Sequence, residues 1–284
     1  MASATTAELF KPTETTHAAF IEEIYKGIGM YQLIGETTVV PLQTPSARNK
    51  VTTYVNDYAS SVELSKNLFD DNLHGVWAKT VEEFALKARV SQNYNSMQIF
   101  RGAFTTVLTH DGYALISASH ALVGGGTASN VVTSPASVAN GALNSDTLNY
   151  AFTNLAEQKD QAGVILGNTP KVLLVPPCLL KKAVELTDSA LIGDSANNAI
   201  NFYRSALGIT VMTSPYLGLV AGGSDTAWFV LADNHGITRL IRQGVQTALR
   251  SWEMSNNRSY LYQANYRESY YARDWAGIVG STGL

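Results

Sequence analysis

The side chains that could carry out catalysis are five histidines, a single cysteine and the acidic residues close to them. A histidine beside a carboxylate can act as a general base, and two stretches offer that pairing: His110-Asp111 and Asp233-Asn234-His235. Each is followed by a glycine, and both DG and NHG are common turn sequences. We therefore interpret both stretches as ordinary turns and keep a His/Asp hydrolase as a remote alternative.

Other sequence patterns that mark active sites are missing. The histidines lack the HExxH spacing of a zinc site, and no GxSxG forms a nucleophile elbow. The run Gly124-Gly125-Gly126 lacks the GK[ST] that completes a phosphate-binding loop. Cys178 follows Pro176-Pro177 at the start of an apolar helical pattern, which favours a packed thiol over a nucleophile. The sequence predicts no catalytic residue, no metal site and no cofactor, and indicates that the protein is not an enzyme.

The composition suits extensive contact with other proteins and equally suits a monomer of low charge. Charged residues make up 15% of the chain, against about 25% in ordinary soluble domains, and polarity comes from uncharged side chains instead. Such side chains lose less than ions when water is removed from them. The net charge of −3 gives no electrostatic basis for tight binding of nucleic acid. No secretion signal or membrane-spanning apolar run is evident, so a cytosol-like compartment is expected.

The first 70 residues suggest parts that cannot fold alone. Residues 1–13 are predicted to be a flexible arm, followed by an amphipathic helix from Glu14 to Ile28. From Thr37 to Lys66 the pattern is that of extended chain, with turn residues at Asn56-Asp57, which predicts a long β-hairpin. An isolated hairpin is marginally stable in water. This one should therefore lie on another surface.

A long helical pattern dominates the next part. It begins at Asp70-Asp71 and runs to about Leu108 without a proline, which at about 1.5 Å per residue gives a rod of roughly 57 Å. Apolar stripes occupy its two ends, and a polar stretch from Ser91 to Gln98 separates them. No sustained heptad is present, so a coiled coil is disfavoured. The helix is expected to be the backbone of a flat, extended subunit.

The rest of the chain predicts an α/β lobe and returning strands. Thr109–Ser145 is rich in glycine and small polar residues and should contain little regular structure. Continuous apolar strands at Val172–Val175 and Trp228–Leu231 indicate a sheet covered on both faces, with helices from Ser145 and Leu179. Near the end, Tyr260, Tyr262, Ala264 and Tyr266 alternate with polar residues, as on one face of a strand. The long helix is the expected partner of that face.

The order of these parts resembles the major capsid protein of tailed bacteriophages, which has the Hong Kong 97-type capsid fold. Local strings strengthen the resemblance across essentially the whole chain. They are FDDN (Phe69–Asn72), DGYALISASHALVGG (Asp111–Gly125), the run from Asn144 to Leu186, NNAIN (Asn197–Asn201) and TAWFVLADNHG (Thr226–Gly236).

The resemblance implies an α+β fold with four parts. These are an N-terminal arm with a short helix (1–35), an extended β-hairpin called the E-loop (36–70), a peripheral domain built on a spine helix (71–115 and 239–284) and an axial domain (116–238). It implies a structural subunit that self-assembles into hexamers and pentamers, forming an icosahedral shell around double-stranded DNA. Portal, scaffolding or decoration proteins would be further partners, and contact with DNA would be weak and non-specific. The protein would be part of the virion, assembled in the host cytoplasm, with no membrane contact.

The candidate contacts between subunits lie in the arm and the predicted hairpin. They are Phe20, Ile24, Arg48, Lys50, Asp57, Glu63 and Lys66. The main alternative is the shell subunit of an encapsulin-like protein nanocompartment, which would share the fold and enclose protein cargo.

Overall fold

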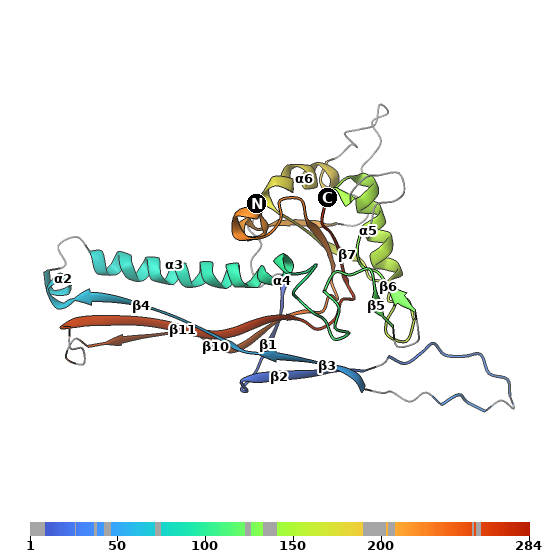
Figure 1. The fold of residues 1–284 in the computed structure, drawn as a ribbon, viewed down its shortest axis with the longest axis horizontal. Helices are drawn as coiled ribbons and strands as arrows, with labels where there is room; N and C mark the ends of the chain where they lie inside the picture. Colours follow the sequence, from blue (N-terminus) through green and yellow to red (C-terminus); the bar gives the residue numbers. More distant parts are fainter. Residues whose placement is uncertain are drawn as a thin grey trace.

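A computed structural model describes residues 9–25, 27–36, 39–42, 47–71, 75–122, 126–132, 141–189, 203, 208–251, 253 and 257–284. The protein is a flat, L-shaped molecule of the α+β class (Figure 1). A long helix and a long sheet form one arm of the L, and an α/β lobe rises at the end of that arm. A hairpin extends away below the lobe.

The described strands form two four-stranded sheets and two two-stranded pairs. The long sheet has the order β1-β10-β11-β4, and the sheet of the lobe has the order β12-β9-β7-β8. The pairs are β2-β3 and β5-β6. The strands are β1 (Lys11–Glu14), β2 (Ala19–Tyr25), β3 (Ala47–Tyr54), β4 (Asn56–Ser65), β5 (His120–Ala121), β6 (Thr127–Ala128), β7 (Pro170–Val175), β8 (Thr210–Thr213), β9 (Trp228–Ala232), β10 (Ile237–Arg250), β11 (Ser259–Ala272) and β12 (Ile278–Ser281).

The helices are shorter than the sequence predicts. The single helix expected from Asp70 to Leu108 is wrong, because Gly75 adopts a left-handed conformation (φ 62°) that interrupts it. Asp70-Asp71 therefore ends one helix and does not begin the long one. The helices are α2 (Lys66–Asp71), α3 (Val76–Ser96), α4 (Gln98–Arg101), α5 (Ser145–Glu157) and α6 (Leu180–Thr187), with 3-10 turns η2 (Pro177–Leu179), η4 (Pro215–Leu217) and η5 (Leu219–Ala221).

The expected packing of the long helix on the aromatic strand is confirmed. Phe84 of α3 packs edge-on against Tyr262 of β11, with ring centroids 5.5 Å apart. Ser91 on the same helix shares a 2.8 Å hydrogen bond with the hydroxyl of Tyr266. The polar middle of α3 thus meets polar groups of the sheet, which explains why a helix with a polar centre can lie on this surface.

The α/β lobe also agrees with the sequence prediction. Its core contains Leu148 and Leu155 of α5 packed with Val175 and Val230 from the sheet, and all four side chains are fully buried. Asn144 and Thr147 form a reciprocal capping box that starts α5. One strand was missed: β12, in the segment assigned from the sequence to the peripheral domain, pairs antiparallel with β9 at the edge of the lobe's sheet.

The first described residues are anchored in the body, which makes the prediction of a flexible arm wrong for residues 9–13. Leu9 and Phe10 are buried. The ring of Phe10 packs against Phe100 of α4 and Tyr270 of β11, at centroid distances of 6.2 and 5.1 Å. Strand β1 then pairs in parallel with β10.

The predicted helix from Glu14 to Ile28 is wrong, because this segment forms β2 and pairs antiparallel with β3. The hairpin of the molecule is therefore β2-β3. The predicted turn at Asn56-Asp57 is also wrong: it lies at the start of β4, which pairs along its whole length with β11. The assignment of residues 36–70 to an E-loop stays a prediction.

Candidate functional site

In the part of the chain that the structure describes, a large exposed apolar surface covers the outer part of the hairpin, between β2 and β3. We define the hairpin tip as residues 27–36 and 39–42, which extend into solvent (Figure 1). Glu36 is the only charged residue from 27 to 42. Monomeric proteins rarely expose so many contiguous apolar groups, so this surface indicates a binding role. The large exposed apolar residues are Ile28, Met30, Tyr31, Leu33, Ile34, Val39, Val40 and Leu42.

Sequence reasoning missed the hairpin tip. Its run of apolar residues has neither a clear helical nor a clear strand period, and so it was divided between a helix and a strand. One signal in the sequence could have revealed the tip. Residues 27–42 are mostly apolar and contain one charged residue, and no neighbouring helix or strand was predicted that could bury them.

The structure places four of the predicted contact residues on the hairpin. Ile24 is buried and Phe20 packs against Tyr271, so both face the body of their own chain. Lys50 is exposed on β3. Arg48 lies in the same strand, and its side chain is outside the described part.

The other three candidates lie outside the hairpin and have partners in their own chain. Asp57 forms an ion pair with Arg267 at 3.6 Å. Glu63 accepts a hydrogen bond from Ser259, and Lys66 pairs with Asp70 one helical turn away. Asp57 and Glu63 thus join β4 to β11, whereas the pair of Lys66 lies within α2. The role of these three residues between subunits remains a prediction.

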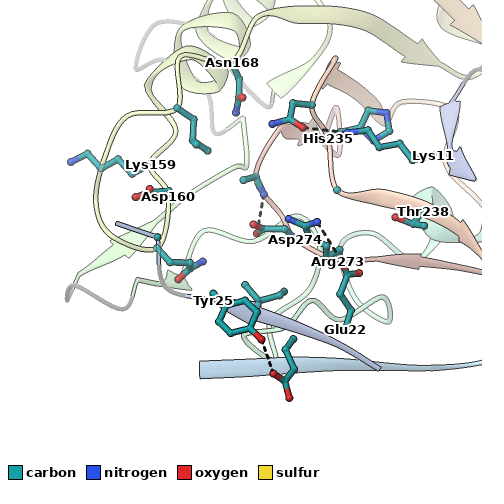
Figure 2. Close-up of a pocket in the computed structure, with 18 residues that line it drawn as sticks. Lys11, Glu22, Tyr25, Lys159, Asp160, Asn168, His235, Thr238, Arg273 and Asp274 are labelled. Atoms are coloured by element: carbon teal, nitrogen blue, oxygen red, sulfur yellow. Dashed lines mark hydrogen bonds and ion pairs between the residues drawn. The ribbon is translucent and has the colours of Figure 1, made fainter. Parts of the chain in front are cut away.

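A polar cleft of about 450 Å³ lies where the base of the hairpin meets the body (Figure 2). It is lined by β2, the loop from Lys159 to Asn168, the turn before β10 and the segment after β11. Charges of both signs face it, among them Lys159, Arg273 and Asp160. The cleft therefore lies where the hairpin, the lobe and the long sheet meet.

Glu22 attaches the hairpin to the long sheet. The hydroxyl of Tyr271 donates to Glu22 Oε2 at 3.0 Å, and Arg273 Nη1 lies 3.3 Å from Glu22 Oε1. Burial and the neighbouring carboxylate raise the pKa of Tyr271, so the phenol stays protonated and remains a donor.

His110 connects the hairpin to the lobe. Its Nδ1 lies 3.3 Å from the side-chain amide of Asn49 on β3, and its Nε2 lies 3.3 Å from the amide of Gln161. The same Nε2 is 3.3 Å from Asp274 Oδ1. Burial opposes ionisation of Asp274, but the contacts with His110 and with backbone N–H groups outweigh it and lower the pKa of this carboxyl. His110 is thus a structural connector inside the turn that the sequence predicted.

A second histidine is fully enclosed. His120 is 0% exposed and stacks on Trp275, with ring centroids 4.6 Å apart. Its Nδ1 lies 2.7 Å from Asp111 Oδ2, and its Nε2 lies 3.2 Å from Asn130 Oδ1. Asn130 is oriented by two backbone contacts, donating to Leu115 and accepting from Ser117.

Both ring nitrogens of His120 therefore lie against oxygen atoms of its own chain. Burial opposes ionisation of Asp111, but hydrogen bonds from His120 and Thr109 lower the pKa of its carboxyl. This Asp–His pair resembles a catalytic dyad in composition. Both nitrogens of the enclosed ring already have partners in the chain, so neither is left for a substrate.

His235 lines the cleft, and its pKa is lowered to about 4 by burial and by the nearby charge of Lys11, with Asp233 opposing. An unfolded histidine has a pKa near 6.5, so on acidification the unfolded chain binds the proton first. The folded state therefore keeps its full stability with respect to His235 above about pH 6.5, and it loses stability as the pH falls from there toward 4.

We expect the free energy of unfolding of dissociated subunits to fall by about 2 kcal/mol more in wild type than in His235→Gln between pH 7 and pH 5. Urea denaturation at the two pH values measures it. His17→Gln, at an exposed position, is the control and should keep the wild-type pH dependence. Equal pH dependence of wild type and His235→Gln would contradict the prediction.

The remaining chemical candidates can be placed briefly. Cys178 is exposed in η2, so the prediction of a packed thiol is wrong. Across the described residues, no group of histidine, cysteine, aspartate and glutamate side chains could hold a metal ion. None of the described helices combines the length and apolar character needed to cross a membrane.

Comparisons with known proteins agree with this geometry. A family model described as phage capsid protein matches residues 49–281. The capsid of an empty GTA particle aligns with a TM-score of 0.62 over 98% of this chain and 89% of its own, at 12% identity. Microbacterium phage Oxtober96 aligns at 0.59 over 99% and 92%, with 14% identity. The capsid of Myoviridae phage XM1 aligns at 0.55 over 94% and 86%, with 12% identity. No curated protein sequence matches the chain.

Proposed function

The chain belongs to the family of phage capsid proteins, and on that premise we propose that it builds the hexamers and pentamers of an icosahedral tailed-phage head. It is a structural subunit of the head shell. The protein-nanocompartment alternative is not favoured, because the family model that matches the chain is that of phage capsid proteins. A catalytic role is not part of the proposal.

The single observation that carries the assembly mode is the hairpin tip. Its apolar side chains are largely exposed, and the contacts of Glu22 and Asn49 with the body lie at the base of the hairpin. In a closed shell each copy repeats the same contacts, so a projecting apolar segment is buried once per subunit. We propose that the tip lies on an adjacent subunit, and that the body divides into a peripheral part around α3 and an axial part around β7 and β9.

The shell would enclose double-stranded DNA with weak, non-specific contact, in line with the net charge of −3. Portal, scaffolding or decoration proteins would bind the assembled shell or its precursor, which would form in the host cytoplasm. Electron microscopy and sedimentation of the purified protein test the proposal. Closed particles or ring-shaped capsomers are expected, whereas a stable monomer at high concentration would refute it.

We further propose that Arg48 and Lys50, on the hairpin, set its register on the neighbour. Charge complementarity contributes specificity more than affinity, and each exposed pair contributes only about 0–1 kcal/mol. We expect Arg48→Glu combined with Lys50→Glu to leave subunits folded by circular dichroism and to reduce closed particles, with partial recovery at higher salt. Sedimentation and microscopy at two ionic strengths measure this. Normal particle yield at low salt would contradict the role of these charges.

A further inference from the structure

An apolar stripe lies on the face of α3 that points away from the long sheet. Leu86, Val90 and Tyr94 follow one another at a spacing of four residues, and all three are exposed. The sheet is contacted by the opposite face of the helix, through Phe84 and Ser91. The stripe therefore contributes nothing to the packing of α3 on the long sheet.

A second exposed apolar pair is held by a rigid loop in the lobe. Leu219 and Val220, in η5, are 68% and 104% exposed. Asp225 Oδ1 accepts a hydrogen bond from the backbone N–H of Leu219 at 2.9 Å. At Gly223 a Cβ would collide with the carbonyl oxygen of Leu217, so the tight turn requires glycine there. The exposure of the two aliphatic side chains is therefore fixed by the loop and does not result from a loose segment.

The stripe and the loop form one surface. Tyr94 packs edge-on against Tyr216, with ring centroids 5.8 Å apart. Arg101 joins them: its Nη1 donates to the carbonyl oxygen of Tyr216 at 2.9 Å, and its guanidinium lies 4.2 Å from the centroid of Tyr94. We define the corner surface as Leu86, Val90, Tyr94, Tyr216, Leu219 and Val220.

The position of the corner surface indicates what covers it. Figure 1 is viewed along the shortest axis, and in it α3 and the lobe meet at the inner corner of the L. The corner therefore opens within the plane of the flat molecule, where neighbours in a shell must lie. Charged residues of α3 flank its apolar centre, as expected of a protein interface. They are Glu82, Glu83, Lys87 and Arg89, all exposed.

We propose that the corner surface binds a second copy of this chain through that copy's opposite flank, which carries α5 and the base of the hairpin. Rotation about a ring axis joins two different surfaces, in a heterologous contact that closes when the ring is complete. Figure 1 shows α5 on the side of the lobe opposite to the corner. That flank exposes apolar residues of its own, including Tyr150, Ile165 and Leu166. The inference rests on the proposed self-assembly and names the surfaces that carry it.

The first test places a charge in each half of the corner surface. Leu86→Asp combined with Val220→Asp should leave the subunit folded, because both side chains are exposed in the isolated chain. Burying two carboxylates against apolar neighbours should lower the yield of closed particles by about tenfold or more. The matched control, Leu108→Asp with Leu284→Asp, changes two exposed leucines outside the corner and should assemble as wild type does. Equal loss in the control, or normal assembly of the corner variant, would overturn the proposal.

The second test distinguishes a head-to-tail contact from a corner-to-corner contact. A corner variant still presents an intact opposite flank, so it should join growing rings of wild type and block the next addition. Co-expression of tagged corner variant with wild type at equal levels should therefore reduce wild-type particles well below the yield of wild type alone. Unchanged wild-type yield, with the variant absent from particles, would overturn the head-to-tail arrangement. If wild type stays monomeric, the proposed function and this inference are both overturned. If wild type assembles and the corner variant assembles equally well, only the inference is overturned.

Discussion

Replacing Tyr31, Leu33 and Leu42 with serine is expected to abolish closed particles while the subunit stays folded and soluble. These three side chains are almost completely exposed in the isolated subunit, so their loss removes little from its own core. In the shell, burying each would contribute about 1.5–3 kcal/mol relative to leaving it in water. Because every copy loses the same contacts, the closed shell should fail as a whole.

Electron microscopy and sedimentation measure the particles, and urea denaturation of dissociated subunits measures the fold. The control is Leu108→Ser with Leu284→Ser, which removes exposed apolar groups outside the hairpin. Abundant closed shells from the triple variant would show that the tip is not a contact between subunits. A lowered denaturation midpoint would show that the tip packs on its own chain.

Asp111→Asn is expected to destabilise the subunit by about 1–3 kcal/mol, because an amide cannot replace the carboxylate that lies 2.7 Å from the enclosed ring of His120 and accepts a hydrogen bond from Thr109. The pKa of Asp111 is lowered in the folded protein, so its stabilisation is present above about pH 4 and is lost as the pH falls below it. Urea denaturation at neutral pH measures the loss, and the variant should also show a weaker dependence on acid than wild type.

The exposed ion pair of Asp57 with Arg267 supplies the matched control. Asp57→Asn makes the same chemical change at a carboxylate that is more than half exposed and should cost only about 0–1 kcal/mol. A similar small loss in Asp111→Asn would mean that the enclosed pair contributes no more than a surface pair.

The lobe could be predicted from the sequence because its elements are locally unambiguous. Strands β7 and β9 are short, continuous apolar runs, a pattern typical of strands covered on both faces. Helix α5 has a strong cap at Asn144 and a regular apolar stripe. In these elements the local pattern and the tertiary environment favour the same structure.

The first part of the chain could not be predicted because its structure is decided by distant partners. Phe20, Ile24 and Tyr25 satisfy a helical spacing, yet the segment becomes a strand because β3 pairs with it. Asn56-Asp57 has the residues of a turn, but β4 is held straight by β11, about two hundred residues later. The interruption of the long helix depends on the positive φ of Gly75, which a single glycine in a helical pattern does not reveal.

The residues of the candidate site were only partly predicted from the sequence. Of the candidate contact residues, Lys50 lies on the β2-β3 hairpin, and its role between subunits stays a prediction. The aromatic and aliphatic residues of the tip were missed because apolar side chains are ordinarily assigned to a core. The pairing of His120 with Asp111 was missed because a nine-residue separation carries no periodic signal.

The pairing of β12 with β9 sets the order in which the subunit can mature during synthesis. The lobe's sheet lacks one of its edge strands until residue 281 has left the ribosome, although β7 and β9 emerge much earlier. Phe10 likewise waits for Tyr270, its ring partner, which is made about 260 residues later. A nascent chain that still lacks β12 therefore cannot present a finished surface to its neighbours on the same messenger RNA. Delayed completion of this kind separates the synthesis of the earlier strands from polymerisation, because the lobe is finished only once β12 has paired with β9.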